Sequence, residues 1–266
     1  MNIPQAHETP SYFSGNIGLR LHGSDRRDST PLHDMLDLIG VTAGDDWPMS
    51  TFQPTVRRLQ TGELLFLEGA PATSIHIVRT GVFKVFRTAE DGYEQVFGFV
   101  RRGELLGCDA LFDARHQMAT VALEDASVFA IALPDFHALA QHLPSFDRGI
   151  LRAMARAMLD LTRVSEMMAA AASEVRLARF LLHVSRCMST CGQSPRSLRL
   201  QMTRRDIGSY LGVAHETISR SFAALMEAGL IEVEQRKVEI LDLGSLQSFA
   251  QGTRAPAKTQ RPALNS

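Results

Sequence analysis

The hydrophobic pattern of the chain changes near residue 146, and this change limits the fold more than any other feature. Between about residues 55 and 135, short apolar runs alternate or are rich in β-branched and aromatic residues, with glycines at their ends. Such strands with regular turn signals are typical of an antiparallel barrel or roll. From residue 146 to about 171, apolar residues recur at helical spacing, which predicts a helix of about 25 residues. We therefore expect a β-rich domain followed by a long helix.

The apolar stripe of this helix is narrow and rich in methionine, and the residues leave two interpretations open. The helix can pack on its own domain. Alternatively, two copies of the chain can pair along the stripe as a coiled coil, because the helix is longer than an average globular helix. The stripe consists of Ile150, Met154, Met158, Leu161, Val164 and Met168.

Residues 204–225 have the pattern of two helices joined by a tight turn. The Thr203 hydroxyl can cap the first helix. Gly208 leaves room for the second helix to cross closely, and Gly212 falls where the turn needs a left-handed conformation. The inward-facing apolar positions are Ile207, Leu211, Val213, Ile218 and Phe222. These features predict a helix-turn-helix, with a plain α-hairpin as the alternative.

The second helix of this pair is polar on its outer face at the N-terminal end. In a DNA-binding helix-turn-helix, these positions look into the major groove of the duplex. They are Ala214, His215, Glu216, Ser219 and Arg220. The exposed E-x-x-S-R pattern favours a DNA-reading helix over a plain α-hairpin.

Composition limits the partners and the compartment. The net charge is −1, so any contact with nucleic acid must come from a local patch, such as residues 195–222, which hold five arginines against two acidic residues. The chain has no apolar run long enough to span a membrane and no basic start followed by an apolar block. Three cysteines are too few for a disulfide framework. We expect a cytoplasmic protein without a membrane partner.

Several segments resemble the CRP/FNR superfamily of bacterial transcription regulators. "MTRRDIGSYLG" and "ETISR" are similar to the FNR branch and its FixK-like relatives, and the likeness extends upstream through "LPSFDRG", "GELLGCDALF" and "RTGVFKVFRTAEDGYEQVFGF". The resemblance covers about residues 50–245. It implies an α+β fold with an N-terminal antiparallel β-roll like that of cyclic-nucleotide-binding proteins, a long dimerisation helix and a C-terminal winged helix-turn-helix. It also favours the coiled-coil interpretation of the long helix.

The resemblance and the pattern together predict five segments along the chain. A short helix is expected around "PLHDMLDLI", within an otherwise flexible N-terminal extension. The segments are a flexible extension at 1–45, the β-roll effector domain at 46–142, the dimerisation helix at 143–171, the winged helix-turn-helix domain at 172–248 and a disordered basic tail at 249–266.

In the FNR branch, a glutamate, a serine and an arginine read TTGA-type half-sites, and the matching residues here are Glu216, Ser219 and Arg220. Arginine can bond to guanine O6 and N7, and a carboxylate can accept from the cytosine amino group. Ala214 stands where relatives have a capping threonine or serine, and His215 is a further candidate for a base contact. A homodimer would bind a near-palindromic TTGA-type operator and regulate respiratory or redox-related genes.

Other DNA and protein contacts follow from the same resemblance. The candidates for contacts with DNA phosphates are Arg199, Thr203, Arg204 and Arg205. The turn "TAEDGYEQ" resembles a surface that recruits RNA polymerase, with Asp91 and Gly92 at its centre. The expected partners are double-stranded DNA, RNA polymerase and a second copy of the chain.

The effector that the roll senses is not determined by the resemblance. The cyclic-AMP branch uses a glutamate and an Arg–Ser pair, but Cys108 and Met118–Ala119 stand at these positions, so cyclic AMP is not expected. Three cysteines cannot supply the four thiolates of a [4Fe–4S] cluster. Cys108 is either a small buried side chain or a redox group. Cys187 and Cys191 have helical spacing but no further metal ligand.

Several alternatives remain open from the sequence. No cofactor is predicted, although nine histidines leave a haem ligand open. The same fold could be gated by a ligand, a haem or a redox change and read a different operator, or it could regulate a protein without DNA. No phosphate loop, nucleophile elbow or H-E-x-x-H motif is present, so an enzyme is not expected.

Overall fold

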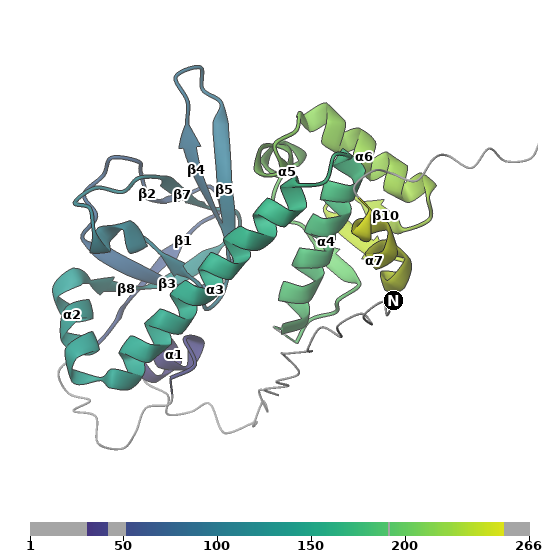
Figure 1. The fold of residues 1–266 in the computed structure, drawn as a ribbon. Coiled ribbons are helices and arrows are strands. Elements are labelled where there is room, and N and C mark those ends of the chain that lie inside the picture. The colour runs from purple at the N-terminus through teal and green to yellow at the C-terminus, as the bar shows by residue number, and fades with distance from the viewer. Residues whose placement is uncertain (1–30, 42–51, 191, 253–266) are drawn as a thin grey trace, which may run out of the picture.

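The computed structural model describes residues 31–41, 52–190 and 192–252. A β-rich domain, a long helix and a mostly helical domain follow one another, as Figure 1 shows. The fold is therefore α+β, with the predicted order of elements. Within the described ranges, no helix is both long and apolar enough to cross a membrane.

Two four-stranded antiparallel sheets form the β-rich domain, which confirms the predicted roll. The first sheet has the order β1 (Thr55–Leu59), β8 (Ala126–Ala132), β3 (Ser74–Thr80) and β6 (Leu105–Leu106). The second sheet has the order β2 (Leu64–Phe66), β7 (Ala119–Ala122), β4 (Phe83–Thr88) and β5 (Glu94–Val100). A short 3₁₀ helix, η1 (Cys108–Leu111), lies between β6 and β7. Strand β5 is thus an edge strand that pairs with β4 alone, and its outer edge faces the C-terminal domain (Figure 1).

The turn between β3 and β4 requires glycine. Gly81 has a φ of +86°, and a β-carbon at this position would lie 2.6 Å from the β-carbon of Ala126. A larger residue would therefore push β4 away from β8. Glycine lets the chain reverse here and send β4 into the second sheet.

Helix α1 (Pro31–Leu38) confirms the predicted short helix, but it is part of the roll rather than of a flexible extension. Leu32, Met35 and Leu36 are fully buried in one core cluster with residues of β3 and β8. Arg79 on β3 also pairs with Asp34 at 3.5 Å. The prediction of a flexible segment over 1–45 is wrong for residues 31–41, because their apolar face is buried against the sheet. Residues 1–30 and 42–51 lie outside the described part of the chain.

The long helix α3 (Pro144–Met168) follows α2 (Leu133–His142) and confirms the predicted change of period. Its apolar stripe is divided between the chain's own core and the surface. Ile150 is only 4% exposed and packs in the core of the roll, so its assignment to a dimer seam is wrong. Met154 and Val164 are half-buried against their own domains. Met158 is 70% and Leu161 62% exposed, and Met168 is exposed as well.

The C-terminal domain has the predicted winged helix-turn-helix arrangement. Its elements are α4 (Ser173–Thr190), β9 (Ser197–Arg199), α5 (Arg204–Leu211), α6 (His215–Glu227), β10 (Ile231–Glu234), β11 (Lys237–Ile240) and α7 (Leu243–Gln251). The three strands form one antiparallel sheet in the order β10, β11, β9. Helix α7 continues to Gln251, so the predicted tail cannot begin at residue 249. Residues 253–266 lie outside the described part.

The two domains share one hydrophobic core. Phe86 and Val96 of the roll are buried in the same cluster as Phe180 and Tyr210 of the C-terminal domain. The Phe99 ring lies 5.1 Å from the Tyr210 ring, centre to centre. The position of the helix-turn-helix is thus set by packing on the β4–β5 hairpin as well as by its covalent link to α3.

Candidate nucleic-acid interface

The helix-turn-helix is built by the local residues that the sequence predicted. Thr203 caps α5: its hydroxyl accepts from the Asp206 amide at 3.1 Å, and the Asp206 carboxylate accepts from the Thr203 amide at 2.9 Å. A β-carbon on Gly208 would lie 2.8 Å from the Val213 carbonyl oxygen, so only glycine allows this close crossing. Gly212 has a φ of +66° at the turn. The predictions for Thr203, Gly208 and Gly212 are confirmed.

The N-terminal end of α6 exposes all four predicted base-contacting side chains. His215, Glu216, Ser219 and Arg220 are all exposed. Ala214 is the N-cap residue and provides no side-chain hydrogen bond, so the backbone N–H groups of the first turn lack that partner. An uncapped helix N-terminus with exposed polar side chains can receive an anionic partner such as a DNA backbone.

The contacts of these four side chains stay within the first two turns of α6. His215 Nδ1 lies 3.3 Å from Glu216 Oε2, and Ser219 donates to the His215 carbonyl at 3.1 Å. Arg220 donates to the Thr217 hydroxyl over a long 3.4 Å. These exposed local contacts are weak, so the side chains can exchange them for contacts with bases at little cost.

The four predicted phosphate contacts differ in their surroundings. Thr203 is engaged in the cap, and the Arg204 guanidinium stacks on the Phe222 ring, with Cζ 3.3 Å from the ring centre. Burial lowers the pKa of Arg204. Arg199 and Arg205 are exposed on the surface. Thr203 is exposed as well, but its hydroxyl is bonded to Asp206, so Arg199 and Arg205 are the exposed cations among the four.

The wing adds two cations that the sequence analysis did not single out. Arg236 and Lys237 are exposed at the turn between β10 and β11, beside Gln235, whose φ is +52°. Lys237 also pairs with Glu239 at 3.7 Å. The short run "EQRK" between two β-segments was the available signal, but its position beside a helix-turn-helix depends on the tertiary fold.

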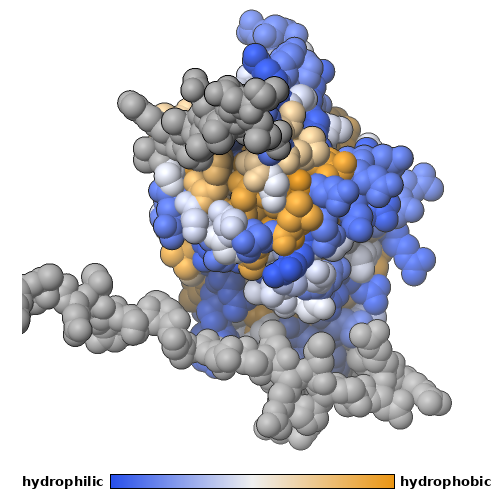
Figure 2. All heavy atoms as spheres, turned by 90° about the vertical axis from the view of Figure 1, so that its right-hand side faces the viewer, coloured by the Kyte–Doolittle hydropathy of each residue, from blue (hydrophilic) through white to orange (hydrophobic). Residues whose placement is uncertain are grey.

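Figure 2 shows the face of the molecule that lies at the right in Figure 1, where the C-terminal domain is found. Hydrophilic side chains surround a central apolar patch on this face. Among the described residues of this domain, the large apolar side chains that are exposed are Met226 and Leu241. Contacts with a polyanion must therefore come from the hydrophilic parts of this domain.

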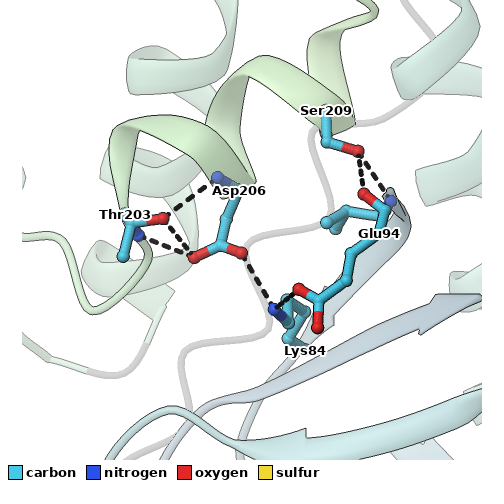
Figure 3. A network of polar contacts seen from close by, with 6 residues as sticks. Lys84, Glu94, Thr203, Asp206 and Ser209 are labelled. Atoms are coloured by element: carbon cyan, nitrogen blue, oxygen red, sulfur yellow. Dashed lines mark hydrogen bonds and ion pairs between the residues drawn. The ribbon is translucent and has the colours of Figure 1, made fainter. Parts of the chain in front are cut away.

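A buried polar network joins α5 to the β4–β5 hairpin, as Figure 3 shows. The Lys84 ammonium lies 2.6 Å from the Glu94 carboxylate and 3.0 Å from the Asp206 carboxylate. The side chains of Lys84 and Asp206 are each only 9% exposed. Asp206 thus caps α5 together with Thr203 on one side and binds the roll on the other.

Electrostatics favours the ionised form of this network. Burial alone would lower the pKa of Lys84, but its hydrogen bonds to Glu94 and Asp206 outweigh burial and raise that pKa. Burial would likewise raise the pKa of Asp206, but hydrogen bonds from Thr203 and Lys84 lower it. Both groups are therefore charged at neutral pH, and the network is an ion pair rather than a neutral contact.

The outer edge of β5 is bonded to α5 through Ser209. The Val96 amide donates to the Ser209 hydroxyl at 2.9 Å, and this hydroxyl donates to the Glu94 carbonyl at 2.7 Å. The serine thus covers backbone groups that would otherwise be open at the edge of the sheet. The sequence analysis missed Lys84, Glu94 and Ser209, because these residues meet only after the two domains pack.

The region of the roll that holds the nucleotide in cyclic-AMP-binding proteins has a different chemistry here. The Asp109 carboxylate accepts from the Gln117 amide at 2.7 Å and lies 2.9 Å from His116 Nδ1. Ala119 is buried, and Arg115 donates to the Gly69 carbonyl. A carboxylate lies in η1, and Met118 and Ala119 stand in place of the Arg–Ser pair that holds the cyclic phosphate in the cyclic-AMP branch. The residues present do not fit a cyclic nucleotide.

The two thiols in the described part of the chain are poorly suited to redox chemistry. Cys108 is half-buried, and burial followed by the nearby Asp109 raises its pKa to about 11. Burial also raises the pKa of Cys187, whose sulfur lies 3.7 Å from His183 Nε2. A thiol with a raised pKa is a weak nucleophile at neutral pH, which argues against the redox role considered for Cys108. Cys191 lies outside the described residues.

No group of three or more histidine, cysteine or acidic side chains in the described residues could hold a metal ion. Buried imidazoles are nevertheless present in the roll and in α4. Burial lowers the pKa of both His76 and His183 to about 4. His76 Nδ1 has no hydrogen-bond partner. These histidines are neutral at neutral pH.

A β-roll, a long helix and a winged helix-turn-helix with an exposed polar second helix define a class of DNA-binding transcription regulator. The sequence profile of the cyclic nucleotide-binding domain family matches residues 56–142. The profile of the Crp-like helix-turn-helix domain family matches residues 175–249. Both matches fall on the two domains described above.

Characterised relatives agree with this class. The transcriptional regulatory protein Btr of Bordetella pertussis is 36% identical over 195 residues, which are 72% of this chain and 79% of that protein. The transcriptional activator protein Anr of Pseudomonas aeruginosa is 35% identical over 74% of this chain and 80% of its own length. The structure of FixK2 from Bradyrhizobium japonicum aligns with a TM-score of 0.65 and 24% identity, over 77% of this chain and all of that one. The chain belongs to the CRP/FNR family of transcription regulators and is not an enzyme.

Proposed function

We propose that the protein is a homodimer that reads a near-palindromic operator with TTGA-type half-sites through Glu216, Ser219 and Arg220. The observation that carries this proposal is the exposed E-x-x-S-R pattern at the N-terminal end of α6, whose side chains are bonded only within their own helix. His215 extends the same surface toward an outer base pair or a phosphate. Arg199 and Arg205, with Thr203 and Arg204 beside them, position the domain on the DNA backbone.

The chemistry of the pair Glu216 and Arg220 explains why a carboxylate faces a polyanion. Arginine can donate two parallel hydrogen bonds to guanine, and glutamate can accept from the amino group of cytosine. The two residues are four positions apart, so they lie on one face of α6. Each contact discriminates against a wrong base by about 1–3 kcal/mol.

The exposed apolar face of α3 supports pairing with a second copy. Leu151, Met154, Met158, Leu161 and Met168 occupy positions of one heptad repeat, with Ser165 at the remaining position. Leu151 is 57% exposed and replaces the buried Ile150 in the predicted seam. Pairing along this face would place two recognition helices about 34 Å apart, one turn of DNA.

A gel-shift titration with a TTGA-type palindrome tests the proposal. The wild-type protein is expected to bind, and Arg220→Ala to bind at least about tenfold more weakly. The matched control is Arg186→Ala, which removes the same charge from an exposed position on α4. If Arg220→Ala binds as tightly as this control, the proposed reading is wrong.

The names of two relatives indicate which kind of genes the protein regulates. Proteins that are 33% and 32% identical to this chain are called "fumarate and nitrate reduction regulatory protein" and "anaerobic regulatory protein". We infer that the protein acts in the cytoplasm on genes of respiratory or redox metabolism. Transcript profiling of a deletion strain under oxygen-rich and oxygen-poor growth tests this. An unchanged profile of respiratory genes would contradict it.

We also infer that the β4–β5 turn contacts RNA polymerase through Asp91 and Gly92. Asp91 accepts from the Tyr93 amide at 2.9 Å, which holds the exposed turn in one shape. Replacing Asp91 and Gly92 together should not weaken operator binding and should lower transcription in vitro. Full transcription by a variant that still binds the operator would rule this contact out.

The side chains of the roll limit which signals the protein can sense. The raised pKa of the half-buried Cys108 thiol and the absence of the Arg–Ser pair argue against redox and cyclic-nucleotide gating, and three cysteines in the whole chain cannot ligate a [4Fe–4S] cluster. We propose a regulator without these groups. An absorbance spectrum and a native mass of the purified protein test this, because haem, iron or another ligand would show directly.

A further inference from the structure

The β4–β5 hairpin of the roll lies against α5 of the helix-turn-helix, far from it in sequence. Accepting the proposed operator-reading function, we propose that this contact is an autoinhibitory clamp, which competes with operator DNA for the helix-turn-helix. The clamp comprises Lys84, Glu94 and Val96 of the hairpin with Asp206 and Ser209 of α5 (Figure 3). The clamp must open for the domain to take its DNA-bound position.

The tip of the hairpin reaches the region where DNA would lie. Tyr93 lines an open groove of about 560 Å³ together with Arg205, Val213, Ala214 and residues of the first turn of α6. The lining residues also include His215 and Glu216 at the N-terminal end of the recognition helix. A DNA backbone that approaches Arg205 and this helix end therefore meets the hairpin.

The hairpin tip carries charge of the wrong sign for DNA. The turn holds Glu90 and Asp91, and the Asp91 carboxylate lies at the Tyr93 amide. Glu94 adds a half-exposed carboxylate beside them. Repulsion between these carboxylates and a nearby phosphate extends over about a Debye length, about 8 Å at physiological salt. Opening the clamp would remove this repulsion from the binding surface.

The polar half of the contact suits an interface that opens and closes. A buried ion pair contributes little net stability, because the desolvation of both charges offsets their attraction, but it specifies one arrangement. When the clamp opens, Lys84, Asp206 and the edge of β5 regain water. The apolar part of the contact, in which Phe86 and Val96 share a core with Tyr210, must separate at the same time, so packing as well as the ion pair holds the closed arrangement.

Two substitutions weaken the clamp in different ways. Lys84→Met removes the ion pair and keeps the length and apolar stem of the side chain. Ser209→Ala removes the bonds to Val96 and Glu94 without changing any charge. The control is Arg58→Met, which removes one positive charge from an exposed position on β1 of the same domain. Binding of each variant to a TTGA-type duplex is measured by fluorescence anisotropy.

The clamp predicts that Lys84→Met binds the duplex at least about threefold more tightly than wild type, since a larger fraction of molecules is competent to bind. Ser209→Ala should shift binding in the same direction. The loss of a positive charge by itself would weaken binding, so tighter binding by Lys84→Met cannot come from charge. Arg58→Met should bind as wild type does or slightly more weakly.

Hydrogen exchange in the wild-type protein gives a second measurement that no substitution can disturb. The Val96 amide is protected by Ser209 in the closed clamp, and it should exchange faster when the duplex is bound. Equal or slower exchange in the complex, or variants that bind no tighter than wild type, would overturn the clamp. If wild type binds, Arg220→Ala binds at least about tenfold more weakly, and the clamp variants match wild type, the proposed function stands and the clamp alone is wrong. If wild-type protein does not bind the duplex, both are wrong.

Discussion

The N-terminal end of α6 and the ligand region of the roll differ in how their polar groups are satisfied. On α6, Glu216, Ser219 and Arg220 are exposed and make only weak contacts with neighbouring turns. In the roll, His116 and Asp109 are bonded to each other and to the backbone. Exposed, loosely held side chains are available for an external partner, whereas mutually bonded ones are not.

This difference explains why the sequence identifies the DNA contacts of the protein more clearly than the signal that the roll senses. The E-x-x-S-R pattern has a direct counterpart in the chemistry of base edges. The roll retains the fold of its family, but Cys108 and Met118–Ala119 stand at the positions that match the ligand-binding residues of the cyclic-AMP branch. A retained scaffold does not identify a ligand.

The largest expected effect concerns the helix that connects the two regions. Leu161→Glu places a charge in the exposed seam of α3 and should lower operator binding at least about 100-fold, because a monomer loses the second half-site. Sedimentation should show a monomer. The control Thr162→Glu changes the neighbouring exposed residue, which is not one of the seam positions. This variant should remain a dimer and bind the operator. A dimeric Leu161→Glu would show that the seam lies elsewhere.

On the recognition helix, the contact of Glu216 with cytosine can be tested separately. Glu216→Gln keeps the shape of the side chain and removes its charge, so it should reduce discrimination at the cytosine opposite the guanine of TTGA by about 1–3 kcal/mol. Competition between matched and mismatched duplexes measures this. Unchanged discrimination would show that Glu216 does not read that base pair.

The roll side can be tested through pH. His76 has a pKa of about 4 in the folded protein against an ordinary value of 6.5, so the unfolded chain binds more protons between these values. Its contribution to stability is present above 6.5 and is lost as pH falls toward 4, by about 2 kcal/mol from about pH 7 to about pH 5. His76→Phe should flatten this dependence in urea unfolding. An equally steep fall in the variant would show that His76 is not buried and neutral.

For cyclic AMP, no effect on the protein is expected. Adding cyclic AMP should leave operator affinity and the thermal unfolding temperature unchanged, because Met118 and Ala119 stand in place of the Arg–Ser pair of the cyclic-AMP branch. Both quantities can be followed in one titration. A rise in the unfolding temperature with cyclic AMP would show that the roll binds this ligand and that its polar groups are available to an external partner.

Short sequence patterns predicted most of the fold and of the recognition helix. Thr203, Gly208 and Gly212 act through neighbours within a few residues, so their roles could be inferred from spacing alone. The period of the apolar residues located α3, but it could not tell Ile150, which faces the roll, from Leu151, which faces outward. That choice depends on which side of α3 the roll covers, and this is a property of the tertiary fold.

Contacts between residues far apart in the chain could not be predicted from the sequence. Lys84 and Asp206 are 122 positions apart, and nothing near either residue identifies the other as its partner. The burial of α1 was missed for the same reason, since an amphipathic segment of eight residues shows its apolar face but not the surface that receives it. Both contacts arise when elements pack, after local structure is set.

The reading of guanine by Arg220 is tested most directly by replacing the guanine of each TTGA half-site with 7-deazaguanine. This base lacks the N7 acceptor and leaves the cytosine partner intact. Wild-type protein is expected to lose about tenfold in affinity, whereas Arg220→Ala should bind both duplexes equally, because the lost contact is already absent. An equal loss in both proteins, or no loss in wild type, would show that Arg220 does not read this base.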